Sequence, residues 1–461
     1  MARSPRPAVE PIPAGHSVAG PAPGPGRHGL RGSPGPGGEI RPLSGSIDQA
    51  PSPALSRPGP ASTQGQRKPT LKAHSLIDKV YRWENLYTAW RRVRRNKGAH
   101  GLDRVTIRQF EADWETHLRE IQRKLVERRY KPQPVRRVYI PKPPKQRRPL
   151  GIPIVADRVV GQALHQVLDP LFDKSMSERS FGFRKGRKAH HAIATVIRDA
   201  KEGYRQVVDA DIASFFDRID HQVMMSLVRA RIADGRVLNL IEAFLKAGVF
   251  ENNSVYVPTE GVPQGGVISP WLSNLVLDVL DKAIEAKNWR HVRYADDFVV
   301  LVRSRQEAKE AHGYVKEILG QLKLSLHETK TRLTDFSEGF EFLGFRFRRY
   351  HLGIRGRSID RFQDRLRTLT RRQQGRNIEA VIADVNPVVR GWAGYVGVAE
   401  VTKVLERLDC WVRMRLRAFR YQRRSRHDNH RLTNRRLAKM GLLSLQHCRP
   451  RGRLSYVDAE I

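Results

Sequence analysis

Two adjacent aspartates, Asp296 and Asp297, lie in the stretch HVRYADDFVVLV (291–302), with an apolar run on each side. Short apolar runs of this kind predict β-strands, and the compact arrangement is a hairpin with both acids at its tip. Because buried carboxylates are costly, two together need a compensating cation. Oxygen-only ligands favour Mg²⁺, held by a few carboxylates together with substrate phosphates.

A third acid is expected from a neighbouring strand, and the stretch VVDADIASFFDRIDH (207–221) supplies it. Asp211 ends a short apolar strand, and Asp209 shares its face because side chains in a strand alternate with a period of two. Phosphoryl transfer by two metal ions about 3.5–4 Å apart uses shared carboxylates of this sort. An exposed Asp-Asp turn, which is common in proteins, is the plain alternative for the pair at 296–297.

The charge of the chain points to a polyanionic partner. Lys and Arg number 84 against 47 Asp and Glu, for a formal net charge of +37 over 461 residues. Nucleic acid is the commonest such partner, and a ribosomal-type or generally adhesive basic protein is the alternative. Cys410 and Cys448 are the only cysteines, which excludes a disulfide framework and a four-cysteine zinc site. The sequence shows no apolar run long enough for a membrane span and no signal-peptide core, so we expect an intracellular protein.

The elements that must position these acids can be read from composition and periodicity. Residues 1–72 are rich in Pro, Gly, Ser and Arg and are predicted to be disordered. From about 358 onward the chain is helical and very basic, so a domain boundary is expected near 350–360. Apolar periodicity predicts helices over 75–98, 106–128, 156–174, 187–201, 220–247, 269–286 and 305–322. Strands are expected around a basic turn within 130–153, at 207–210, within 253–262, in the quoted hairpin and at 340–347.

Seven stretches, in order, resemble motifs of one family. YADDFVVL resembles the YxDD hairpin of reverse transcriptases, and VVDADIASFFDRIDH resembles the first acidic motif of that family. The other stretches are VRRVYIPKPPKQRRPLGIPIVADRVV, ERSFGFRKGRKAHHA, GVPQGGVISPWLSNLVLDVLD, LSLHETKTRLTDF with FEFLGF, and VNPVVRGWAGYVGVAE with LDCWVRMRLR. The last of these resembles the maturase domain of group II intron proteins. Over roughly 75–450, the chain is similar to group II intron-encoded reverse transcriptase/maturases of the endonuclease-less bacterial type.

This resemblance implies an α+β fold of the right-hand polymerase type. Residues 73–350 would form fingers and palm, with an antiparallel palm sheet and helices, and residues 351–461 a helical thumb and RNA-binding maturase region. The implied activity is RNA-directed DNA synthesis with two Mg²⁺ ions, together with assisted splicing and retromobility of the host intron. The partners would be group II intron RNA, an RNA template, a DNA primer and dNTPs, in a ribonucleoprotein of the bacterial cytoplasm.

The resemblance also assigns residues around the reaction. Asp211, Asp296 and Asp297 would be the catalytic carboxylates, and together with Ile212 they would form the metal-binding set. Nucleotide-binding roles fall on Lys142, Arg148, Phe216, Gln264 and Lys330. A flexible ammonium and a forked guanidinium suit the triphosphate, and Phe216 would exclude a 2′-hydroxyl while Phe215 packs in the core. Gly265 and Gly266, beside Gln264, would permit a close backbone approach.

RNA contacts are expected from Arg184 and Arg187 in the template-facing motif and from Arg390, Trp392 and Tyr395 in the maturase region. Arginines and aromatic rings pair with phosphates and stack on bases. The alternative for both rings is helix-to-helix packing. One departure lies in GLDRVT, where Arg104 replaces the glycine usual in relatives and leaves the loop shape open.

Two other functions are weighed against this interpretation. A splicing factor with an inactive polymerase is disfavoured because the metal-binding acids are complete. A reverse transcriptase recruited to defence or CRISPR adaptation is disfavoured by the maturase-like segment. The endonuclease domain of some relatives is missing from the sequence, so we expect no DNA cleavage. His427, His430 and Cys448 are too few and too poorly spaced for a zinc site.

Overall fold

A computed structural model of the chain describes residues 72–142, 146–349, 351–423, 425, 427–450 and 452, without the side chains of Lys142 and Gln146. The disorder predicted for 1–72 therefore falls outside the described residues, except for Lys72. The described residues belong to a compact unit that starts at Pro69. Within these ranges, no helix is both long enough and apolar enough to cross a membrane.

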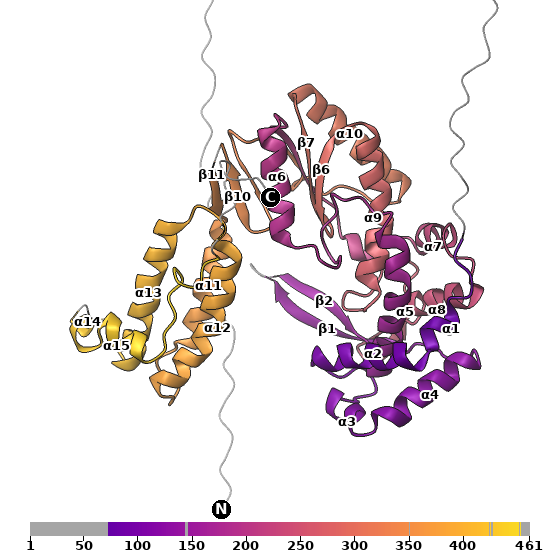
Figure 1. Cartoon of the computed structure of the whole chain (residues 1–461), viewed down its shortest axis with the longest axis horizontal. Coiled ribbons are helices and arrows are strands. Elements are labelled where there is room, and N and C mark those ends of the chain that lie inside the picture. The colour runs from indigo at the N-terminus through magenta and orange to yellow at the C-terminus, as the bar shows by residue number, and fades with distance from the viewer. Residues whose placement is uncertain are drawn as a thin grey trace, which may run out of the picture. The chain divides into compact units, whose positions relative to one another are not determined.

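The palm is built on a four-stranded sheet in the order β6-β7-β3-β8 with every neighbouring pair antiparallel (Figure 1). The sheet confirms the antiparallel palm expected from the sequence. Helices on its two sides complete an α+β arrangement. The strands are β3 (Gln206–Asp211), β6 (Arg290–Tyr294), β7 (Asp297–Val302) and β8 (Arg332–Asp335), and the helices that pack on the sheet are α6 (Ala189–Lys201), α9 (Ser269–Ala286) and α10 (Arg305–Gln321). Helix α7 (His221–Arg229) packs on α9, and α8 (Gly235–Leu245) packs on α7.

Strand β7 explains why its sequence is apolar without alternation. All five residues after Asp297 are fully buried. Phe298, Val300 and Val302 join one hydrophobic core with α9 and α10, whereas Val299 and Leu301 join a second core with α6. A strand covered on both faces needs apolar residues at every position, which the sequence FVVLV provides.

The fingers carry a separate sheet in the order β2-β1-β4-β5. Its β1–β2 hairpin confirms the predicted strand, basic turn and strand, and Figure 1 shows it as a two-stranded ribbon leaving the helices around α2 and α5. The elements are α1 (Ile77–Tyr81), α2 (Trp83–Arg95), α3 (Ile107–Ala112), α4 (Trp114–Val126), β1 (Val135–Lys142), β2 (Gln146–Ile152), α5 (Val155–Asp173), β4 (Val249–Glu251) and β5 (Ser254–Tyr256).

The C-terminal part is mainly helical, as expected. A three-stranded sheet of β9 (Phe340–Phe342), β10 (Phe345–Arg348) and β11 (His351–Ile354) leads into α11 (Gly356–Leu369), α12 (Ile378–Val396), α13 (Thr402–Arg420), α14 (Asp428–Arg431) and α15 (Asn434–Lys439). The second hydrophobic core contains Val207 and Phe345 from the sheets together with Val385 and Leu405 from α12 and α13. The expected boundary near 350 is therefore crossed by a shared core.

Three predicted helices are broken in the structure. The helix expected over 75–98 is interrupted at Arg82, and the helix expected over 106–128 is interrupted at Asp113. The helix expected over 220–247 divides because Asp234 accepts hydrogen bonds from the first backbone N–H groups of α8 and also from those of Leu76 and Ile77. Apolar periodicity continues through such breaks, so the pattern alone does not reveal them. Asp220 caps α7 by accepting hydrogen bonds from two of its first backbone N–H groups.

The loop at Arg104 keeps the conformation that a glycine would provide. Arg104 has a φ of 61°, in the left-handed region. This backbone conformation is disfavoured for residues with a Cβ atom, which gives a physical reason for glycine at this position in relatives. Arg104 therefore adopts a backbone conformation that is strained for a residue with a side chain.

Asp157, near the start of α5, is a buried acid that makes stability depend on pH. It accepts hydrogen bonds from Tyr130 Oη (2.7 Å) and from the backbone N of Gln133 (2.9 Å). Burial outweighs these hydrogen bonds and raises the pKa of Asp157 to about 6. Because the folded state then holds a proton that the unfolded state releases near pH 4, stability falls as pH rises from about 4 to about 6.

We predict that Asp157→Asn removes this pH dependence, because an amide does not ionise and still bonds both partners: its oxygen can accept from Gln133 N while its NH₂ donates to the Tyr130 hydroxyl oxygen. Relative to the variant, the wild-type protein should lose about 3 kcal/mol of unfolding free energy between pH 4 and pH 7. Denaturant unfolding across that range measures the difference, with the exposed Asp364→Asn as control. Parallel pH profiles for wild type and Asp157→Asn would contradict the burial argument.

Candidate active site

The three predicted catalytic acids come together at one end of the palm sheet. Strand β3 runs antiparallel to β7, and Asp211 is directly paired with Asp297. Strands β6 and β7 form a hairpin in which Tyr294 pairs with Asp297, so Ala295 and Asp296 make the two-residue turn. The hairpin with acids at its tip is therefore confirmed. Asp297, rather than Asp296, lies across from Asp211.

Electrostatics at this end of the sheet favour a cation. The pKa of Asp297 is raised to about 7. The largest cause is desolvation of the carboxyl group by the surrounding protein atoms, and repulsion from Asp209, Asp296 and Asp211 adds to it. The pKa of Asp209 is raised to about 6, mainly by burial, although Arg332 opposes the shift. Like charges that perturb one another in this way are stabilised by a bound divalent ion, and their oxygen donors suit Mg²⁺.

The side chains are not arranged as a closed metal cage. Among the described residues, no group of three or more His, Cys, Asp or Glu side chains has metal-holding geometry. Asp211 instead pairs with Lys330, whose Nζ lies 2.9 Å from Asp211 Oδ2. Lys330 therefore lies beside the predicted catalytic acids and compensates the charge of Asp211. The oxygen donors and the pairing of Asp211 with Asp297 suit the predicted metal set, with few ligands from the protein.

Ile212, the fourth member of the predicted metal set, is buried and offers only backbone atoms. It faces Leu326 across an isolated β-bridge. The hydrogen bonds of this bridge use its neighbours: His327 N donates to Asp211 O (2.7 Å), and Ala213 N donates to Ser325 O (2.9 Å). The carbonyl of Ile212 is thus not the acceptor in either bond.

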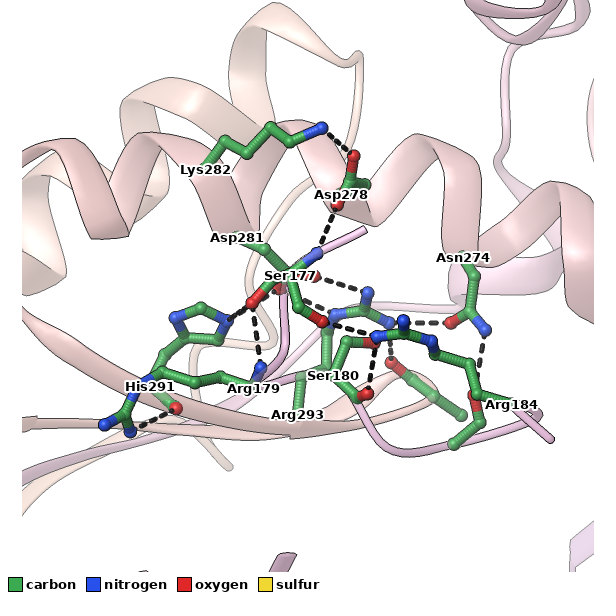
Figure 2. Close-up of polar contacts among 12 residues, drawn as sticks. Ser177, Arg179, Ser180, Arg184, Asn274, Asp278, Asp281, Lys282, His291 and Arg293 are labelled. Carbon is green, nitrogen blue, oxygen red and sulfur yellow. Dashed lines mark hydrogen bonds and ion pairs between the residues drawn. The ribbon is translucent and has the colours of Figure 1, made fainter. Parts of the chain in front are cut away.

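Sequence reasoning missed a buried polar network beneath the hairpin turn (Figure 2). The Arg293 guanidinium, fully buried in β6, donates to both carboxylate oxygens of Asp281 in α9 (2.8 and 2.6 Å). Arg293 also donates to Asn274 Oδ1 (2.9 Å) and to the turn carbonyl of Ala295 (3.0 Å). Burial alone would raise the pKa of Asp281, but Arg293 and His291 outweigh it and hold that pKa below its usual range. The sequence did contain one signal of this network, an arginine within a short apolar strand, but it did not reveal that Asp281 is the partner of Arg293.

Two parts of the chain match known protein families. Residues 140–347 match the reverse transcriptase (RNA-dependent DNA polymerase) family, and residues 359–439 match the group II intron maturase-specific domain. Protein YkfC of Escherichia coli K12 is 34% identical and is matched over 62% of this chain and 86% of its own length. The chain belongs to the group II intron reverse transcriptase/maturase family.

More distant similarities add detail without extending this assignment. The group II intron-encoded protein LtrA of Lactococcus lactis is 31% identical, over 59% of this reverse transcriptase and 57% of LtrA. Telomerase from Candida albicans, solved with a fragment of telomeric RNA, aligns over 68% of this chain and 63% of that chain, at 12% identity and a TM-score of 0.41. That level of structural similarity supports no argument about function.

In the reverse transcriptase, the PQGG turn joins the fingers to the palm. Gln264 accepts a hydrogen bond from the backbone N of Gly151 in β2 (2.7 Å), and Val262 donates to the carbonyl of Phe216 (2.7 Å). Phe216 is partly buried beside the core, while Phe215 is buried, as expected. These backbone hydrogen bonds connect the PQGG turn to β2 on one side and to Phe216 on the other, and Phe216 follows Asp211 by five residues.

Gly265 makes the close backbone approach predicted for this turn. Its φ is +115°, and a Cβ atom there would lie 2.5 Å from the carbonyl oxygen of Gly151. The approach is made to strand β2 of the protein itself. Both the backbone angle and the lack of space therefore require glycine.

The remaining residues that were predicted to bind the nucleotide lie on the fingers hairpin. Arg148 is exposed on β2, where it pairs with Ile140. Lys142 is the last residue of β1, and its side chain falls outside what the structure describes. The hairpin therefore presents a basic strand pair on a sheet separate from the carboxylates.

Arg184 and Arg187 have different surroundings, although both were expected to bind RNA. Arg184 is 7% exposed, and its guanidinium donates to Asp173 Oδ1 (2.6 Å) and to the carbonyls of Ser177 and Ser180. These bonds fix the loop and engage the guanidinium within the protein, while the expected RNA contact of Arg184 stays a prediction. Arg187 is partly exposed and lies over the Phe181 ring, 5.7 Å from its centroid.

The two maturase-region rings make packing contacts, which was the alternative considered. Trp392 stacks on Phe362 with centroids 4.3 Å apart. The Tyr395 hydroxyl donates to the carbonyl of Leu343 (2.7 Å), and its ring stacks on His190 at 5.2 Å. Burial, with Tyr294 and Asp297 nearby, raises the pKa of Tyr395 to about 12. Arg390, by contrast, is exposed.

We predict that Gly265→Ala impairs nucleotide use. The added methyl group would meet the Gly151 carbonyl, and the left-handed backbone would be strained, so the PQGG turn must shift. The KM for dNTPs should rise about tenfold or more, with little change in RNA binding. Steady-state incorporation on a primed RNA template measures this effect. The control is Gly235→Ala, where a Cβ meets nothing within 4 Å, and equal KM values for the two variants would contradict the prediction.

Proposed function

We propose that this reverse transcriptase copies RNA into cDNA with two divalent metal ions held at Asp211, Asp296 and Asp297, and that it binds its intron RNA for splicing and retromobility. The observation that supports this most directly is the pairing of Asp211 with Asp297, beside Asp296 in the turn. Acids from two strands whose charges perturb one another are the arrangement that phosphoryl transfer with shared metal ions requires.

The protein contributes positioning and charge to this reaction. Bound Mg²⁺ ions would acidify the primer 3′-hydroxyl and offset the charge of the triphosphate. Asp211, Asp296, Asp297 and the backbone of Ile212 would supply the oxygen ligands. Lys330 neutralises Asp211 while no metal is bound and is placed to move to a phosphate when substrate enters, because both partners of its ion pair are about half exposed.

Nucleotide selection would involve the fingers hairpin and the PQGG turn together. Lys142 and Arg148 would bind the triphosphate from the basic ribbon, which leaves the core as a hairpin and can approach the substrate. Gln264 would line the nucleotide, and Phe216 would face the sugar. The backbone bonds that join Gly151, Gln264 and Phe216 give these groups a fixed relation to Asp211.

RNA binding would use the exposed cations of the C-terminal helices together with Arg187. Arg390 on α12, Arg407 on α13 and Arg435 on α15 are exposed. Each can neutralise a phosphate and release a counterion, which makes binding dependent on salt. The match of residues 359–439 to the maturase-specific domain favours intron RNA as the partner over a role in defence.

The carboxylates of Asp211 and Asp296 should be essential for DNA synthesis but not for RNA binding. Asp211→Asn and Asp296→Asn should each lower primer extension on an RNA template by at least about 100-fold, because transition-state charge is no longer stabilised. Intron RNA binding should change by less than about threefold, since phosphate contacts lie elsewhere. Exposed Asp364→Asn is the matched control. Primer extension by the double variant at the wild-type rate would overturn the metal assignment.

The exposed arginines of the C-terminal helices should account for part of the salt dependence of RNA binding. Replacing Arg390, Arg407 and Arg435 by Gln should flatten the dependence of log affinity on log salt by about 2 to 3 for intron RNA. Filter binding across a salt series measures the slope. The matched control replaces Arg305, Lys309 and Lys316, which are exposed on α10, with the same loss of charge. Equal slopes for both triple variants would show that net charge alone, and not the maturase surface, determines binding.

A further inference from the structure

The turn that carries Asp296 has a backbone conformation that its sequence does not favour. Ala295, the first turn residue, has a φ of 61°. A positive φ at the first position of a two-residue hairpin turn is normally provided by glycine, asparagine or aspartate, and not by alanine. A Cβ-bearing residue persists in this conformation only when its surroundings impose it, and such sites are concentrated where function needs fixed geometry.

The first constraint on this turn comes from Arg293. Its guanidinium donates to the carbonyl of Ala295 at 3.0 Å, while its other donors are held by Asp281 and Asn274. Arg293 is fully buried and Asp281 is 1% exposed, so neither side chain can relax into solvent. The guanidinium is planar and forked, which makes this a rigid link between helix α9 and the turn.

The second constraint comes from the opposite side of the same residue. Gly182 lies so close to the turn that an added Cβ would collide with the backbone N of Ala295 and lie 2.9 Å from the carbonyl carbon of Tyr294. The Gly182 segment is itself fixed, because Phe181 N donates to Arg293 O (2.8 Å) and Asn274 Nδ2 donates to Gly182 O (2.8 Å). Asn274 therefore connects Gly182 to Arg293, and Figure 2 shows it on the same helix as Asp278 and Asp281.

We infer that Arg293 and Gly182 form a clamp on Ala295 that holds it in the left-handed conformation and so fixes the direction of Asp296. Arg293 is thus a positioning residue for DNA synthesis, acting through the backbone without touching substrate. The inference rests on the proposed catalytic role of Asp296. It also gives Gly182, in the motif ERSFGF, a role in the geometry of the active site.

Two independent variants test the clamp. Arg293→Lys keeps a cation beside Asp281 but lacks the fork that reaches the turn carbonyl, and Gly182→Ala pushes the turn from the other side. Each should lower kcat by about tenfold to 100-fold, with the KM for dNTPs and the affinity for RNA changed by less than about threefold. Arg417→Lys is the matched control for the first variant, because Arg417 is also buried and its guanidinium also makes two bonds, to the carbonyl of Leu432 (2.8 Å) and to Asn434 Oδ1 (2.7 Å), away from the palm sheet. Gly313→Ala is the control for the second, because a Cβ there meets nothing within 4 Å.

A double-variant cycle separates positioning from simple loss of structure. Glycine at 295 removes the penalty of the left-handed conformation, so Arg293→Lys should reduce kcat less in an Ala295→Gly background than in the wild-type background. Thermal unfolding of each variant establishes that activity is compared between folded proteins. Equal reductions in both backgrounds, or activity losses that track the folded fraction, overturn the clamp.

A readout without activity distinguishes this inference from the function on which it rests. In metal-free protein, hydrogen exchange of the peptide 291–298 should become faster in Arg293→Lys and Gly182→Ala than in their two controls. Faster exchange with unchanged kcat would refute the catalytic assignment of Asp296 and, with it, the positioning role. Unchanged exchange would refute the clamp while leaving the proposed polymerase function in place.

Discussion

The antiparallel register between β3 and β7 is the constraint on which the rest of the structure depends. It puts Asp211 across from Asp297 at the end of both strands, where their negative charges repel. The register cannot slip by one residue, because Val299 and Leu301 would exchange cores with Phe298 and Val300. Apolar burial on two faces thus holds together carboxylates that would otherwise separate, and this arrangement gives the site its demand for cations.

The acid cluster and the basic surplus serve the same substrate. A net charge of +37 attracts a nucleic acid wherever it meets the surface. At one end of the palm sheet, however, the chain presents acids, of which Asp211 is compensated by the exposed Lys330. Cations on the hairpin and the C-terminal helices would hold the polymer, and the carboxylates would hold the ions that balance the triphosphate. The acidic carboxylates and the basic side chains therefore lie in different places, and both would interact with the same nucleic acid substrate.

Much of this arrangement could be predicted from the sequence where the signal is local. The apolar run after Asp297 indicated a β-strand, and the motif order indicated the fold. The roles of Arg184, Trp392 and Tyr395 could not be predicted, because each depends on contacts distant in the chain, such as the hydroxyl of Tyr395 on Leu343. The same limit applies to Arg293, since its position in an apolar strand signals a buried pair without naming the partner.

The most direct test of the central claim is extension of a DNA primer on an RNA template by the full chain with Mg²⁺ and dNTPs. The product should be cDNA whose sequence follows the template, and a chelator should stop its synthesis, because the carboxylates of β3 and the hairpin act through divalent ions. Tight binding of the primed RNA template without any extension, at every Mg²⁺ concentration tried, would contradict the account.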